Sequence, residues 1–101
     1  MSDTILVTGI IDLDPAKRDA AIAAVTKVME ATQAEAGCVT FTFSADVSDP
    51  GRFWLQEEWA DEDSLAAHME QPHLAELMGA MGELGVTSAV IKQWDATERP
   101  A

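Results

Sequence analysis

The chain of 101 residues contains a single cysteine, Cys38, and this scarcity limits the chemistry open to it. One thiol cannot form an internal disulfide, and it cannot supply a metal site that needs several cysteines. We therefore interpret Cys38 as a small, half-buried packing residue. With 48% hydrophobic residues, the chain has the composition of a domain that folds around an apolar core.

Basic residues are also scarce: six Lys and Arg stand against 18 Asp and Glu, and the formal net charge is −12. Such a surface repels the phosphate backbone of nucleic acids and the headgroups of anionic membranes. The apolar runs are too short for a membrane span, and the first residues lack the basic start and apolar stretch of a secretory signal. We therefore expect a cytoplasmic protein without a nucleic-acid or membrane partner.

Motifs for a bound phosphate, a metal or a catalytic nucleophile are absent as well. The six glycines are scattered and none forms GxGxxG. No serine lies in a motif typical of nucleophilic catalysis. The two histidines, His68 and His73, do not make a recognisable zinc motif. We therefore predict no cofactor and no metal, and look for chemistry among histidine, glutamate and tryptophan side chains.

What the first half of the sequence does contain is a clear order of strand and helix patterns. Apolar and β-branched residues at 4–12 predict a strand. Asp14 followed by Pro15 is typical of a helix start, and an apolar stripe then predicts one long helix to about Glu35. Alternating side chains predict a second strand at 38–45, with Val39, Phe41 and Phe43 on one face.

The second half completes the pattern. The turn 48–52 predicts a hairpin to a third strand at 53–59. Asp61 is placed to cap a short helix, Pro72 allows a new helix to start, and 86–94 read as a last strand. This order predicts an α+β, ferredoxin-like β-α-β-β-α-β domain with an antiparallel sheet. We expect one domain over 1–101 with an ordered core at about 4–95.

Both faces of this sheet are expected to carry apolar side chains. On the third strand Phe53, Leu55, Glu57 and Trp59 share one face, and Trp54, Gln56 and Glu58 share the other. On the last strand Val86, Val90 and Trp94 fall on one face, and Ala89 and Ile91 on the other. Helices cover only one face, so the other needs a second cover. We therefore predict a homodimer whose two sheets pack face to face.

His68 is the first candidate for chemistry, because it lies three residues after Leu65 on the inward side of the short helix. A neutral imidazole there suits a general base or a hydrogen bond to a ligand. The alternative is a buried histidine with a purely structural partner. His73 starts the next helix, and it faces either the same pocket or solvent.

Glu57 and Trp59 lie on the inward face of the third strand. An inward glutamate needs a partner, such as His68, Arg52 or Lys92, or else has a raised pKa. It serves either a structural ion pair or proton transfer. Trp59 either stacks on a planar ligand or packs in the core or an interface. We predict His68 and Glu57 as catalytic residues, and four neighbours as the substrate-binding set: Trp59, His73, Leu55 and Leu65.

Four segments in the middle of the chain resemble the antibiotic biosynthesis monooxygenase family, which includes quinol monooxygenases. They are EAGCVTFTF at 35–43, DPGRF at 49–53, EEW at 57–59 and AHMEQPH at 67–73. The resemblance implies a dimeric α+β barrel with a pocket between sheet and helices in each subunit. It also implies cofactor-free oxidation of phenolic or quinol substrates by molecular oxygen. His68 would then be the base or proton relay, Trp59 the wall of an aromatic slot, and Glu57 an orienting group.

The sequence departs from the family pattern because it contains no Asn and no Tyr. Monooxygenase and haem-degrading relatives use a pocket Asn, so that role has no counterpart here. Three hypotheses follow: a cofactor-independent monooxygenase on a small aromatic quinol or polyphenol, a proton-transfer isomerase on a small carbonyl compound, and a non-catalytic ligand-binding or stress-associated dimer. The two catalytic hypotheses require a cavity beside His68, and the third predicts that His68 is packed without one.

Overall fold

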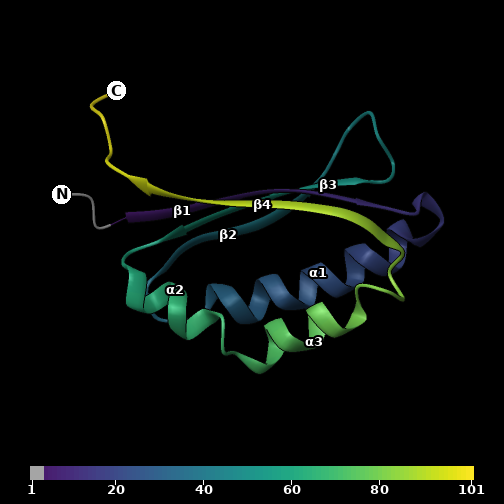
Figure 1. Cartoon of the computed structure of the whole chain (residues 1–101), viewed down its shortest axis with the longest axis horizontal. Coiled ribbons are helices and arrows are strands. Elements are labelled where there is room, and N and C mark those ends of the chain that lie inside the picture. Colours follow the sequence, from purple (N-terminus) through teal and green to yellow (C-terminus); the bar gives the residue numbers. More distant parts are fainter. Residues whose placement is uncertain (1–3) are drawn as a thin grey trace.

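The computed structural model describes residues 4–101, which form a four-stranded antiparallel sheet with helices on one face. The strands are β1 (Thr4–Leu13), β2 (Cys38–Ala45), β3 (Arg52–Trp59) and β4 (Val86–Ala96). The helices are α1 (Arg18–Gln33), α2 (Glu62–His68) and α3 (Pro72–Ala80). The sheet order β2-β3-β1-β4 confirms the ferredoxin-like α+β prediction. Figure 1 shows all three helices beneath the same face, with the β2–β3 turn and the C-terminal end rising on the opposite side.

Local sequence signals account for where the helices begin. Asp14 accepts a hydrogen bond from the backbone N–H of Ala16, and Asp61 accepts one from the N–H of Ser64. Pro72 takes the first position of α3, where a missing N–H costs nothing. The single helix expected from Pro15 to Glu35 is wrong in detail. A 3-10 helix at Pro15–Lys17 precedes α1, which ends at Gln33.

The core lies between the helices and the inner face of the sheet. The odd-numbered residues of β3 are buried there, as predicted, and Trp59 has no exposed surface. Helix α1 contributes Ala21 and Val28, and α2 and α3 contribute one buried leucine each, Leu65 and Leu77. Burying these apolar side chains provides most of the driving force for folding.

At two positions a shift in strand register places side chains on a different face of the sheet from the one predicted. Between β2 and β3 the register shifts between Cys38 and Thr40, and Val39 is 57% exposed instead of joining Phe41 in the core. Between β1 and β4 it shifts between Asp12 and Leu13, so Val86 packs against the core while Val90 and Trp94 lie on the outer face. An extra residue in one strand moves every following side chain to the other face.

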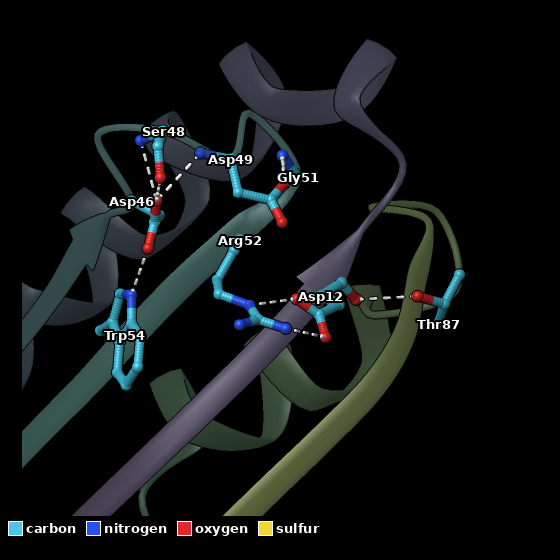
Figure 2. Close-up of polar contacts among 8 residues, drawn as sticks. All are labelled: Asp12, Asp46, Ser48, Asp49, Gly51, Arg52, Trp54 and Thr87. Carbon is cyan, nitrogen blue, oxygen red and sulfur yellow. Dashed lines mark hydrogen bonds and ion pairs between the residues drawn. The ribbon is translucent and has the colours of Figure 1, made fainter.

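The outer face of the sheet is open and apolar. Trp54, Val90 and Trp94 are 44%, 51% and 51% exposed, and they border a groove of about 420 Å³ together with Leu6 and Ile10. At one end of this face Arg52 forms an ion pair with Asp12, and the indole N–H of Trp54 donates to Asp46 (Figure 2). None of the helices in 4–101 is both long and apolar enough to cross a membrane.

Candidate active site

A cavity of about 160 Å³ lies between the inner face of the sheet and helices α2 and α3. Its lining is almost entirely apolar, and Glu57, His68 and Gln93 are the polar residues among those that form it. Met69 and Met78 also line it, and each is more than half exposed, so they mark its opening. A concave, mostly apolar space with a few polar groups is the usual form of a small-molecule site.

His68 forms one wall of this cavity and is only 2% exposed. Its ring lies 4.7 Å from Trp59 and 5.3 Å from Phe41, centroid to centroid, so packing fixes its orientation. Its Nδ1 lies 2.9 Å from Oε2 of Glu35. Because an ionised carboxylate can only accept, Nδ1 carries the proton in this hydrogen bond. Nε2 is then the basic nitrogen, and it has no hydrogen-bond partner within residues 4–101.

Glu35 is the residue that the sequence analysis left without a role. The same Oε2 that accepts from His68 lies 2.7 Å from Nε2 of His73. The backbone of Glu35 is held by its N–H to Thr32 and by its carbonyl to Cys38, in the turn between α1 and β2. One carboxylate oxygen thus joins two histidines from two helices. The sequence signal that could have identified Glu35 is its position as the first residue of the family-like segment 35–43.

Glu57 projects from β3 into the same cavity and is 6% exposed. Its Oε1 accepts a hydrogen bond of 2.8 Å from the indole N–H of Trp59. Burial raises the pKa of the Glu57 carboxyl above its usual value, against the opposing effects of the Trp59 hydrogen bond and the His68 charge. A buried carboxyl of this kind can hold a proton closer to neutral pH than a surface glutamate can.

The predicted site residues fall into two groups. Four of them line the cavity: Leu55, Glu57, Leu65 and His68. Trp59 does not, because it is fully buried and contacts His68 and Glu57 from behind. His73 does not line it either; its ring lies 6.2 Å from the His68 ring, centroid to centroid, and both rings contact Glu35.

Two partners suggested for Glu57 are wrong. Arg52 pairs with Asp12 at 2.8 Å, and Lys92 lines the groove on the outer face. Residues separated by an even number of positions on a strand share a face, whereas Arg52 and Glu57 are five positions apart. Arg52 therefore lies on the outer face of the sheet, as Lys92 does, and the cavity lies on the inner face. The cavity therefore has no cationic Lys or Arg among its lining residues.

Known proteins share the sequence pattern and the fold of this chain. Residues 4–80 match the family model described as antibiotic biosynthesis monooxygenase. An uncharacterised protein from Synechocystis, sll1783, is 28% identical over 96 residues, which are 95% of this chain and 65% of that protein. The chain thus spans slightly less than two thirds of this curated relative.

Solved structures show the same fold. A candidate antibiotic biosynthesis monooxygenase from Deinococcus radiodurans is 24% identical, with a TM-score of 0.89 over 96% of both chains. A second one, from Caulobacter crescentus, is 25% identical, with a TM-score of 0.81 over 96% of this chain and 92% of that one. The protein Rv0793 from Mycobacterium tuberculosis is 21% identical, with a TM-score of 0.85 over 97% and 99%.

Proposed function

This chain belongs to the antibiotic biosynthesis monooxygenase family, and we propose that it is a cofactor-independent monooxygenase that oxidises a small aromatic quinol or polyphenol with molecular oxygen. One observation carries the proposal. His68 is held by Glu35 through Nδ1, its Nε2 is left free, and its ring forms the wall of an apolar cavity beside Glu57. This is the arrangement of an oriented general base next to a second titratable group.

The chemistry starts with removal of the substrate's hydroxyl proton by Nε2 of His68. The resulting electron-rich anion passes one electron to oxygen, and the substrate radical and superoxide then combine in a new C–O bond. The ring hydroperoxide loses water and leaves a quinone carbonyl. One oxygen atom enters the product and the other leaves as water, and the substrate supplies all the electrons. Glu57, whose raised pKa favours its protonated form, is placed to return a proton during loss of water.

The cavity fits a flat, apolar substrate. Phe41, Phe43 and Leu55 are among its walls, and its volume of about 160 Å³ is close to that of an engineered cavity of about 150 Å³ known to hold benzene. The absence of Lys and Arg from the lining disfavours a phosphorylated substrate. Exclusion of water from such a space protects the anion and the peroxide from side reactions.

A proton-transfer isomerase is the second candidate, and the pair of His68 and Glu57 favours it. A base and a carboxyl with a raised pKa that line one cavity can move a proton between two carbons of a small carbonyl compound without oxygen. The cavity beside His68 is a feature that both catalytic hypotheses require. A purely structural His68 would not need it.

The test is oxygen uptake by the purified protein with a panel of reduced naphthoquinols and polyphenols, using labelled oxygen gas. We expect uptake well above the spontaneous rate, and one labelled atom in the product. His68→Gln should lose at least about 100-fold in rate, the usual contribution of a positioned base. Turnover of a carbonyl substrate without oxygen uptake would point to the isomerase instead.

Two further variants guard against a trivial loss of folding. Met78→Trp changes a half-exposed residue at the cavity opening, so it should leave the fold intact but hinder substrate entry and raise KM. Glu76→Gln, on the exposed side of α3, is the matched control and should behave as the unmodified protein. Full activity of a folded His68→Gln variant would overturn the proposal.

A further inference from the structure

We infer that Glu35, His68 and His73 form a binding site for one divalent transition-metal ion of the zinc class. Oε2 of Glu35, Nδ1 of His68 and Nε2 of His73 are the three ligand atoms, and all lie within 4.8 Å of one another. The sequence analysis predicted no metal because two histidines alone do not make a zinc motif. The fold supplies the third ligand from a distant turn.

The spacing of these atoms is close to that of a metal's ligands. Two imidazole nitrogens and one carboxylate oxygen bound tetrahedrally at about 2.0–2.2 Å to one ion lie roughly 3.4 Å apart. The two distances to Glu35 are already 2.9 Å and 2.7 Å. On binding, these two distances would widen by roughly half an ångström, and the separation of the two nitrogens, at most 4.8 Å, would shorten. In the hydrogen-bonded state each of the two nitrogens that would bind the ion carries an N–H proton, so metal binding requires the other tautomer of both rings.

The three ligands are also held in place by their surroundings. Trp59 and Phe41 pack on the His68 ring, and the carbonyl of His68 accepts from the N–H of Gln71 in the turn that leads into α3. The two histidines are therefore fixed relative to one another by a short, hydrogen-bonded turn. Preorganised ligands of this kind lose little entropy when they bind.

The site has a route for an ion. His68 is 2% exposed, whereas Glu35 and His73 are 11% and 20% exposed at their side chains, so the site opens on the His73 side, away from the cavity. The net charge of −12 attracts cations to the whole surface. Two histidines and one carboxylate leave a fourth position for water, as in catalytic zinc sites and in the facial triad of non-haem iron.

Metal binding has a consequence for His68. An ion on Nδ1 fixes the proton of the neutral imidazole on Nε2, the nitrogen proposed as the base. A bound metal therefore converts the proposed base into a hydrogen-bond donor and inhibits the reaction. This consequence rests on the proposed function, whereas the metal site itself does not.

The experiment is a titration of untagged, EDTA-treated protein with ZnCl2 against a chromophoric zinc indicator. We expect one tight equivalent per chain. His73→Ala and Glu35→Gln should each weaken that equivalent by at least 10-fold. Glu70→Gln, an exposed acid in the turn after α2, is the matched control for binding to the acidic surface and should leave the affinity unchanged.

A second readout separates a metal site from a merely structural cluster. Long-range nitrogen NMR of the histidine rings should show zinc on Nδ1 of His68 and on Nε2 of His73. Weak zinc binding that is the same in His73→Ala as in the unmodified protein would overturn the inference. Tight zinc binding without any change in the NMR signals of the two ring nitrogens would overturn it as well.

Inhibition of oxygen uptake by zinc, reversed by EDTA, should accompany binding. If zinc binds as expected but no substrate is oxidised, the proposed function fails and the metal site stands. If substrate is oxidised and no zinc binds, the metal site fails and the proposed function stands.

Discussion

At the scale of single residues, one carboxylate decides what His68 can do. Glu35 does not line the cavity, but its Oε2 fixes which nitrogen of His68 carries the proton. Without that acceptor the ring has no preference for leaving Nε2 as the base. The proposed function thus depends on a residue that does not line the cavity.

Glu35→Gln tests this positioning role. Substrate binding should be little changed, because Glu35 is outside the cavity, whereas proton removal should suffer. We expect kcat to fall about 10- to 100-fold with KM changed less than about 3-fold, the pattern of an interaction that acts in the transition state. Steady-state kinetics of oxygen uptake measures both. A rise in KM at constant kcat would contradict the assignment.

Glu57 should make the fold less stable as pH rises. Its folded pKa is raised above the usual 4.5, so the unfolded chain loses this proton first as pH increases. The stability contributed by the protonated group is therefore present below about pH 4.5 and is lost as pH rises through the folded pKa. Each unit of the shift corresponds to about 1.4 kcal/mol.

Glu57→Gln removes that titration and keeps an oxygen for the Trp59 N–H. The variant should gain stability relative to the unmodified protein between about pH 4 and about pH 7, and it should lose activity if Glu57 supplies a proton. Urea unfolding at the two pH values gives the difference, and Glu76→Gln on the exposed face serves as the control. A gap between the two proteins that stays constant with pH would show that burial does not raise this pKa.

At the scale of elements, the sequence predicted the order of strands and helices and the faces of β3, because an unbroken alternation leaves only one way to bury Phe53, Leu55 and Trp59. It could not predict the register shifts that expose Val39 and turn Val86 inward. A bulge has no fixed pattern in a single strand, since it depends on the partner strand.

The sequence likewise predicted only part of the candidate site. His68, Glu57, Leu55 and Leu65 could be placed at the cavity from strand and helix periodicity alone. Glu35 could not, because it lies 33 positions from His68 in a turn, where no periodicity indicates direction. Trp59 and His73 lie on the expected strand and helix. Their side chains contact His68 and Glu35, respectively, and do not line the cavity.

Gly37 links the turn of Glu35 to helix α2. Its φ is +80°, and an added Cβ would collide with Oγ and Cβ of Ser64 in the first turn of α2. Its carbonyl also accepts from the N–H of Ala60 at 2.8 Å. A side chain at this position must therefore displace the helix that carries His68 or distort the turn that carries Glu35.

Gly37→Ala should lower the free energy of unfolding by more than about 2 kcal/mol, because it combines a left-handed backbone with a steric clash. Chemical denaturation measures the loss. Gly79→Ala is the matched control: a Cβ there meets nothing within 4 Å, and alanine in a helix should add about 0.5 kcal/mol. If both variants are equally stable, Gly37 does not hold the two segments together.

At the scale of the whole molecule, the two faces of the sheet differ in what covers them. The inner face is covered by three helices (Figure 1). The outer face exposes Trp54, Val90 and Trp94 around a groove of about 420 Å³. Exposed aromatic side chains grouped on one surface are typical of an interface. The proposed occupant is a second copy of the chain, because a two-fold axis brings the same apolar strip onto itself.

Val90→Asp tests this face-to-face homodimer. A carboxylate at this position, which lines the groove, would be buried in the dimer, and its desolvation opposes that. We expect the unmodified protein to have the mass of two chains of 10.9 kDa in light scattering, and Val90→Asp to have the mass of one.

Val39→Asp is the matched control, since Val39 is also a half-exposed valine on an edge strand, 57% against 51%, but outside the groove. A folded Val90→Asp variant that keeps the mass of two chains would mean that the copies meet through another surface, and an unmodified protein with the mass of one chain would leave the outer face without a self-partner.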